Sequence, residues 1–175
     1  MESKKVPEEK AARIKLFVVD VDGVMTDGRI TINDRGEETK SFDVKDGLGL
    51  KMLSRQGIEV VILTGRESGV VAHRAEELGI KSVYQGIADK RETLRRLMRE
   101  KEMDRSQVCA MGDDLPDLAM FEEAGLCIAV SDAVAEVRGH ADVITRRRGG
   151  FGAVREACDW ILSCQDGSSK MNFTE

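Results

Sequence analysis

The chain has 175 residues, of which 32 are Asp or Glu and 27 are Lys or Arg, so its formal net charge is −5. This length suits one domain with a single hydrophobic core and leaves little room for a second domain. The acidic balance argues against nucleic acid or an anionic membrane as a partner, and no apolar run approaches the roughly 18 residues that a membrane span needs.

From Leu16 onward, short apolar runs alternate with stretches of helical pattern. The first run, Leu16–Asp20, is apolar up to its last residue, which is typical of a strand buried on both faces. The predicted strands are Leu16–Asp20, Gly57–Gly65, Lys81–Gly86, Gln107–Asp113 and Leu126–Val130. The predicted helices are Asp46–Arg55, Glu67–Leu78, Asp89–Lys101, Leu115–Glu123, Ala133–Arg138 and Ala153–Leu162. This alternation predicts an α/β, Rossmann-like fold in which helices flank a parallel sheet.

One segment breaks this rhythm between the first strand and the first helix. Residues 29–43 alternate with a period of two on both sides of the turn-forming sequence Asp34-Arg35-Gly36. We therefore predict a β-hairpin at 29–43 that projects from the end of the first strand. Around it we expect a charged N-terminal extension at 1–13, one domain at 14–164 and a polar tail at 165–175.

The cysteines and the N-terminal segment favour a reducing compartment. Cys109, Cys127, Cys158 and Cys164 show no CxxC pairing and have no neighbouring His at the spacing of metal ligands. Cys109 and Cys127 lie in apolar, strand-like runs, where we expect buried, reduced thiols. The charged N-terminal segment lacks the apolar centre of a secretory signal. We therefore expect a cytoplasmic protein.

Polar and charged residues follow the predicted strands at their carboxyl ends, where an open parallel sheet binds its ligands. In chain order these residues are Asp20 and Asp22 with Thr26 and Asp27 just beyond, Thr64 and Arg66, Lys90, and Asp113, Asp114 and Asp117. Several carboxylates gathered in one place cannot all stay ionised without a counter-charge. A purely oxygen-based set of ligands favours a hard divalent cation, Mg²⁺ rather than zinc.

Such a metal also binds phosphate oxygens, and the neighbouring residues fit the same ligand. Thr64 offers a hydroxyl and Lys90 a point charge to phosphate. Asp20 could attack phosphorus in line to give an aspartyl-phosphate, and Asp22 could protonate the leaving alcohol and then activate water. Taken singly, each has a structural explanation, because acidic loops are common at surfaces and Lys90 could be an ordinary helix residue. The ordered set at successive strand ends favours a phosphatase.

The same residues carry a resemblance to a known family. DVDGVMTDG (Asp20–Gly28), LTGR (Leu63–Arg66), Lys90 and GDDLPD (Gly112–Asp117) resemble the four motifs of the haloacid dehalogenase superfamily of phosphatases. The hairpin followed by FDVKDGLGLK, and then GRESGVVAHRAEELGI, QGIADK and RRGGFGAVREACDWIL, are similar to the 3-deoxy-D-manno-octulosonate 8-phosphate (KDO 8-phosphate) phosphatases. These belong to a subclass without a cap domain, and the resemblance spans about Ile14–Leu162.

The resemblance implies Mg²⁺-dependent hydrolysis of KDO 8-phosphate to KDO and phosphate, a step in the lipopolysaccharide biosynthesis of Gram-negative bacteria. It implies Asp20 as the nucleophile, Asp22 as the acid/base, and Thr64 and Lys90 as phosphate ligands. The metal would be held by the carboxylates of Asp20 and Asp113 and by the backbone carbonyl of Asp22, with Asp114 and Asp117 in supporting roles. The implied substrate contacts are Asp22, Asp43, Val44, Lys45, Asp46, Gly47, Lys51, Arg66, Arg74 and Lys90.

Three of these substrate contacts carry further expectations. Lys51 departs from the family, in which we expect Arg, so a bidentate carboxylate clamp becomes a point charge that could loosen sugar-acid recognition. Arg66 favours the eight-carbon substrate, because a sister group acting on nine-carbon sugar-acid 9-phosphates tends to carry Glu there. Arg74 lies eight residues beyond Arg66, about 12 Å of helical rise, and cannot easily reach its own strand ends. We therefore expect active sites that are shared between subunits, and the resemblance implies a homotetramer.

Two alternatives remain open. A related enzyme could act on nine-carbon sialic-type sugar-acid 9-phosphates, or more broadly on sugar phosphates. A non-enzymatic oligomerisation module is the other, since relatives of this fold serve in assembly. The Asp20, Asp22 and Asp113 set argues against that module, because a domain kept only for assembly has no physical need of converging carboxylates.

Overall fold

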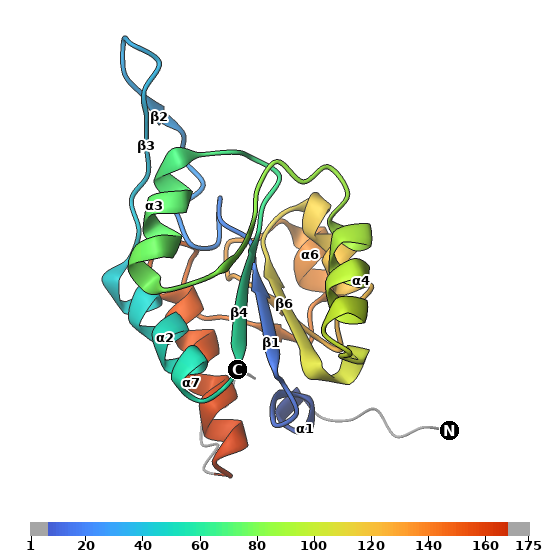
Figure 1. Ribbon diagram of the computed structural model, residues 1–175. Helices are drawn as coiled ribbons and strands as arrows, with labels where there is room; N and C mark the ends of the chain where they lie inside the picture. Colours follow the sequence, from blue (N-terminus) through green and yellow to red (C-terminus); the bar gives the residue numbers. More distant parts are fainter. Residues whose placement is uncertain (1–6, 168–175) are drawn as a thin grey trace.

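Six parallel strands form the centre of the structure, a computed structural model that describes residues 7–167 (Figure 1). Their order across the sheet is β5 (Ser82–Tyr84), β4 (Glu59–Leu63), β1 (Leu16–Val19), β6 (Val108–Gly112), β7 (Leu126–Ala129) and β8 (Val143–Ile144). Every residue of β1, β6 and β7 is buried, as the continuous apolar runs predict. The predicted α/β fold with a parallel sheet is confirmed.

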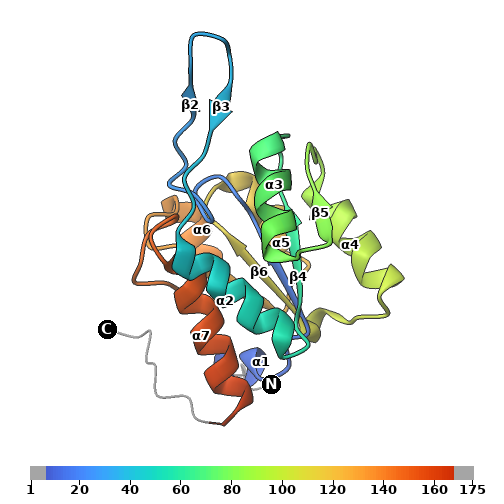
Figure 2. The ribbon, with the colours of Figure 1, turned by 60° about the vertical axis from the view of Figure 1, so that its left-hand side comes forward.

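Helices cover both faces of this sheet (Figure 2). They are α1 (Pro7–Ala11), α2 (Val44–Arg55), α3 (Gly69–Leu78), α4 (Lys90–Glu100), α5 (Leu118–Phe121), α6 (Ala135–His140) and α7 (Ala153–Gln165). On one face α2 packs along α7 and beside α3, and on the other α4, α5 and α6 lie next to one another. Most of the helices begin and end within three residues of their predicted bounds, and α7 continues to Gln165.

The predicted helix Leu115–Glu123 is wrong as a continuous element. The chain forms a 3₁₀ turn at Leu115–Asp117 and then the single α-helical turn of α5. Pro116 lies in the 3₁₀ turn, where its missing N–H costs nothing, and a capping box between Asp114 and Asp117 closes that turn. The sequence pattern also missed α1 and β8, which have five and two residues, because so few residues give no measurable periodicity.

The predicted hairpin is present and rises from the carboxyl edge of the sheet (Figures 1 and 2). Its strands, β2 (Thr31–Ile32) and β3 (Glu38–Thr39), pair antiparallel, and Gly36 takes the left-handed conformation in the turn with a φ of 79°. Within residues 7–167 this hairpin is the only extension between core elements, so the described chain carries no cap domain. Residues 168–175 of the predicted polar tail lie outside the described residues.

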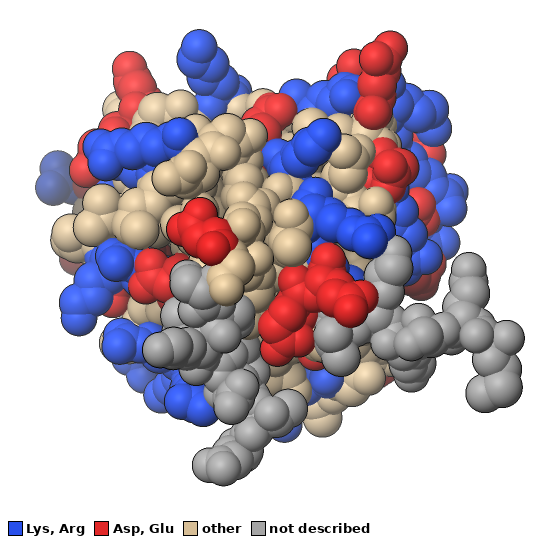
Figure 3. Space-filling view, turned by 90° about the horizontal axis from the view of Figure 1, so that it is seen from below, with Lys and Arg blue, Asp and Glu red and all other residues tan. Residues whose placement is uncertain are grey.

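The opposite end of the molecule mixes the two signs of charge. Seen from below, Lys and Arg side chains lie among Asp and Glu side chains around an uncharged centre (Figure 3). All four cysteines are buried and none is in a disulfide, as predicted for Cys109 and Cys127. In residues 7–167, no helix has both the length and the apolar character that crossing a bilayer demands.

Candidate active site

The candidate site lies where the direction of the sheet's connections reverses. From β1 the chain proceeds through β4 to β5 on one side, and from β6 through β7 to β8 on the other. A crevice forms at such a switch point, outside the carboxyl ends of the two central strands. Asp20 directly follows β1 and its backbone N–H donates to the carbonyl of Met111 on β6 at 3.1 Å, while Asp113 directly follows β6. The two carboxylates therefore face each other across the crevice.

A cavity of about 460 Å³ opens at this point. Of the ten polar residues that the strand-end pattern singled out, Thr26 and Asp27 do not line it. The other eight do: Asp20, Asp22, Thr64, Arg66, Lys90, Asp113, Asp114 and Asp117. They come from four different strand ends, and the parallel sheet alone brings them together. The convergence predicted from the sequence is present in the structure.

Lys90 is the buried cation of the cavity. Its Nζ donates to Asp20 Oδ1 at 2.7 Å and to Asp117 Oδ1 at 2.6 Å, and its side chain is only 5% exposed. Burial lowers the pKa of Lys90, but the two carboxylates outweigh it and hold the pKa above the ordinary value, so the amine stays charged. Asp89 caps α4 by accepting from Glu92 N, and this fixes the position of Lys90 as the first residue of the helix.

Burial and neighbouring carboxylates raise the pKa values of Asp20 and Asp113. Burial, followed by the charge of Asp117, raises the pKa of Asp20 to about 6, and Lys90 opposes that rise. Burial and then the nearby Asp117 and Asp20 raise the pKa of Asp113 to about 8. At neutral pH Asp20 is mostly ionised and remains a competent nucleophile. The remaining repulsion calls for a second cation in the crevice.

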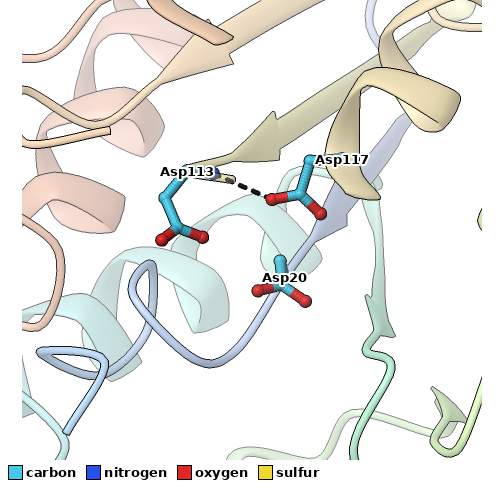
Figure 4. A group of neighbouring side chains, drawn as sticks. All are labelled: Asp20, Asp113 and Asp117. Carbon is cyan, nitrogen blue, oxygen red and sulfur yellow. Dashed lines mark hydrogen bonds between the residues drawn. The ribbon is translucent and has the colours of Figure 1, made fainter. Parts of the chain in front are cut away.

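The donor set fits a hard divalent cation. One carboxylate oxygen from each of Asp20, Asp113 and Asp117 lies within 4.8 Å of the others (Figure 4). Both oxygens of Asp117 are already engaged, with Lys90 on one and the backbone N–H groups of Asp113, at 2.8 Å, and Asp114, at 3.3 Å, on the other. Asp117 is thus a bracing residue, whereas Asp20 and Asp113 are the carboxylates to hold a cation such as Mg²⁺.

Asp22 lies in the loop after β1 between two cations. The Nζ of Lys40 contacts Asp22 Oδ1, and the Nε of Arg66 lies 3.7 Å from Asp22 Oδ2. Sequence reasoning missed Lys40, because a single Lys in a hairpin strand has no pattern that points to a residue 18 positions earlier. Its place depends on the hairpin folding back over the loop that follows β1.

The start of α2 does not reach the cavity in this chain. Asp43 caps α2 by accepting from Lys45 N at 2.7 Å, and Val44 is 79% exposed. Asp46 is buried and accepts from Arg155 N at 2.7 Å and from Gly152 N at 3.3 Å, so it caps α7. Of the segment from Asp43 to Gly47, none lines the cavity.

Arg74 and Lys51 also lie away from the cavity. The Nη2 of Arg74 lies 3.4 Å from the carbonyl of Asp43, and its guanidinium stands 5.6 Å from the ring centre of Phe42. A Cβ on Gly47 would lie 2.4 Å from Nη2 of this guanidinium, so a larger residue there would push the end of the Arg74 side chain aside. Lys51 lies on α2, near enough to Glu77 of α3 to help lower the pKa of that carboxylate, after the larger effect of Arg74.

Two further glycines, Gly23 and Gly149, allow close contacts beside Asp113. Gly23 has a φ of 93°, and a Cβ there would lie 2.0 Å from Asp113 Oδ2. Gly149 touches the same loop from the C-terminal part of the chain, since a Cβ there would lie 1.7 Å from the carbonyl oxygen of Gly23. A side chain at Gly23 would displace the Asp113 carboxylate, and one at Gly149 would displace the loop that follows β1. The sequence offered no indication that residues 23 and 149 meet.

Comparisons with known proteins agree with this geometry. Residues 82–155 match the haloacid dehalogenase-like hydrolase family. Over 158 residues the chain is 44% identical to 3-deoxy-D-manno-octulosonate 8-phosphate phosphatase KdsC of Yersinia pestis, covering 90% of this chain and 84% of that protein.

Two solved structures are similar over nearly their whole length. The 3-deoxy-D-manno-octulosonate 8-phosphate phosphatase of Moraxella catarrhalis, in complex with a magnesium ion, a phosphate ion and a KDO molecule, matches with a TM-score of 0.90 and 46% identity, covering 93% of each chain. A putative haloacid dehalogenase superfamily hydrolase (subfamily III A) of Legionella pneumophila matches with a TM-score of 0.89 and 46% identity, covering 92% of this chain and 88% of that one.

Proposed function

We propose that this chain, which belongs to the 3-deoxy-D-manno-octulosonate 8-phosphate phosphatase family of haloacid dehalogenase-like hydrolases, hydrolyses KDO 8-phosphate to KDO and inorganic phosphate. One observation carries the proposal: the ionisable carboxylate of Asp20 lies beside the buried ammonium of Lys90 and opposite Asp113, in an open cavity of about 460 Å³. The reaction is a phosphoric monoester hydrolysis, and the residues present suit each of its steps.

The reaction proceeds in two steps, and Asp20 and Asp22 take part in both. In the first, an oxygen of Asp20 attacks phosphorus, the bond from phosphorus to the sugar oxygen breaks, and Asp22 gives its proton to that oxygen. In the second, Asp22 takes a proton from water, the water oxygen attacks phosphorus, and the bond from phosphorus to Asp20 breaks. Inorganic phosphate leaves, and both carboxyl groups return to their starting states.

Mg²⁺ is the cofactor, and the carboxylates of Asp20 and Asp113 fit it together with the backbone carbonyl of Asp22. When bound, it neutralises carboxylates and phosphate in the same crevice and draws electron density from phosphorus. Lys90 supplies a fixed positive charge to the phosphate, and Thr64 a buried hydroxyl at the end of β4. Asp117 holds Lys90 in place, and Asp114 caps the adjoining 3₁₀ turn.

The sugar acid is recognised across a subunit interface in a homotetramer. The predicted contacts Asp43, Val44, Lys45, Asp46, Gly47, Lys51 and Arg74 lie outside the cavity of their own chain, whereas Arg66 lines it. Supporting this, large apolar side chains are exposed on the hairpin and at the start of α2, among them Ile30, Ile32, Val44 and Leu48. A neighbouring subunit would cover these side chains and close the open cavity.

The reaction takes place in the cytoplasm and supplies KDO for lipopolysaccharide. The four cysteines are buried and none is in a disulfide, which supports a reducing compartment. Residues 14–164 form the phosphatase domain, with 1–13 as an extension and 165–175 as a tail. The nine-carbon and broad-specificity alternatives and the non-enzymatic module are not favoured by the relatives found.

Phosphate release separates these functions. We would measure Mg²⁺-dependent release from KDO 8-phosphate, a nine-carbon sugar-acid 9-phosphate and phenyl phosphate, with the unmodified protein and with Asp20→Asn. The proposal predicts a kcat/KM for KDO 8-phosphate well above the other two, and loss of all turnover in Asp20→Asn. Equal kcat/KM values for the three substrates would refute specificity for KDO 8-phosphate. Undiminished turnover in Asp20→Asn would refute the role of Asp20 as the nucleophile.

A further inference from the structure

The hairpin brings a buried cation to the loop that follows β1. Lys40 directly follows β3, and although it belongs to an otherwise exposed hairpin, its side chain is only 1% exposed. Its Nζ contacts Asp22 Oδ1 and lies 3.3 Å from Glu38 Oε1. A lysine is rarely buried unless it is paired with carboxylates, and here Asp22 is one of the two partners.

Each oxygen of Asp22 faces a different cation. Oδ1 contacts Lys40, and Oδ2 lies 3.7 Å from Nε of Arg66. Glu38 completes the group, because its Oε1 also accepts from Nη2 of Arg66 at 3.0 Å. The side chain of Arg66 is 47% exposed, so it is the less constrained of the two cations, whereas Lys40 is enclosed. Lys40 is therefore the contact that restricts the Asp22 side chain.

A carboxyl group acting as acid and then base must be aligned with the leaving oxygen. Misplacement of such a group by about 1 Å can lower a rate about a hundredfold, because orientation supplies much of its effect. The Asp22 carboxylate belongs to a loop, which by itself leaves the side-chain rotamers open. A charge-assisted contact to an enclosed ammonium restricts them.

We propose that Lys40 is a positioning residue for the proposed reaction: from the hairpin it orients the Asp22 carboxyl group toward the leaving-group oxygen. This rests on the proposed function, because it requires Asp22 to protonate that oxygen. It gives the hairpin a role in the reaction within its own chain.

Leaving-group dependence tests this without relying on the amount of folded protein. Phenolates of low pKa leave with little protonation, whereas poorer leaving groups need a proton from Asp22. We would measure kcat/KM for a series of substituted phenyl phosphates with the unmodified protein, Lys40→Met, Lys40→Arg and Arg35→Met. Arg35→Met is the matched control, because Arg35 lies at the exposed tip of the same hairpin and pairs with Glu37. A reduced fraction of folded protein lowers every value equally and leaves the slope against leaving-group pKa unchanged.

For Lys40→Met we expect a steeper slope, with a loss about tenfold larger for the poorest leaving group than for the best. Lys40→Arg, which keeps the charge in a different geometry, should give an intermediate slope, and Arg35→Met the unmodified slope. Equal slopes of log kcat/KM against leaving-group pKa for Lys40→Met and the unmodified protein would overturn the proposal. That result is expected if Lys40 only anchors the hairpin or only contacts the sugar acid. Failure of the proposed function is distinct, since it shows in the unmodified protein as absence of KDO 8-phosphate hydrolysis.

Discussion

Replacing Lys90 by Met removes the buried cation on which two carboxylates depend. The ammonium lies 2.7 Å from Asp20 and 2.6 Å from Asp117, and the three side chains are 5%, 8% and 2% exposed. Methionine keeps most of the volume and the apolar stem of lysine, so the change isolates the charge. Asp20 and Asp117 then face each other with no cation between them.

The size and the pH dependence of the lost stability follow from the burial of these three side chains. Removing one partner of a buried ion pair typically costs about 3–5 kcal/mol. Burial and Asp117 already raise the pKa of Asp20 to about 6, and loss of Lys90 raises it further, so near neutral pH the group takes up a proton. Protonation limits the loss to about 3 kcal/mol at pH 7. Because Asp20 binds its proton more tightly in the folded variant than in the folded parent, the loss of stability grows as pH rises above about 6 and levels off below it.

Urea unfolding of the metal-free protein measures this loss. Trp160 is buried and is the only tryptophan in the chain, so its fluorescence reports unfolding. We expect the free energy of unfolding to fall by about 3 kcal/mol at pH 7, and by more at about pH 8.5 than at about pH 5.5. Lys81→Met, at an exposed lysine, is the control and should have no effect beyond about 0.5 kcal/mol. A loss for Lys90→Met below about 1 kcal/mol, or one independent of pH, would refute the electrostatic account.

Three further predictions concern Mg²⁺ binding beside Asp113 and the cap of α7. Gly23→Ala should weaken Mg²⁺ binding at least about tenfold by calorimetry, since its Cβ would lie 2.0 Å from Asp113 Oδ2. Gly57→Ala has a similar φ of 81° and no neighbour within 4 Å, so equal weakening there would contradict the steric cause. Mg²⁺ affinity should rise about tenfold per pH unit from pH 6 to 8, because the pKa of Asp113, raised by burial to about 8, requires a proton to leave on binding. Calorimetry in two buffers of different ionisation enthalpy counts that proton, and no release at pH 7 would contradict the prediction. Asp46→Ala should lower the free energy of unfolding by about 2 kcal/mol through loss of the α7 cap, and a change under about 0.5 kcal/mol in urea would exclude that role.

Much of the sheet and most of the cavity could be predicted from the sequence, for one physical reason. A strand buried on both faces needs an unbroken apolar run, as in Leu16–Val19, and the polar residue that ends the run marks the carboxyl end of the strand. Parallel strands align those ends, so Asp20, Thr64 and Asp113 come together without any knowledge of side-chain geometry.

Contacts between residues distant in sequence could not be predicted in this way. Lys40 reaches Asp22 only because the hairpin folds back, and Asp46 caps a helix 109 residues later through Arg155. Neither contact leaves a periodicity or a motif in the chain. The same applies to β8, whose two residues pair with β7 at the edge of a sheet that is already formed.

The most direct test of the account is to find the phosphoryl group on the enzyme. We would quench the protein in acid during turnover of KDO 8-phosphate labelled with ³²P, with Mg²⁺ present, and map the labelled peptide by mass spectrometry. The account predicts an acid-stable label on Asp20 that is lost at alkaline pH, as expected for an acyl phosphate, and no label in Asp20→Asn. Full turnover with no label on the protein, or with the label on another residue, would contradict it.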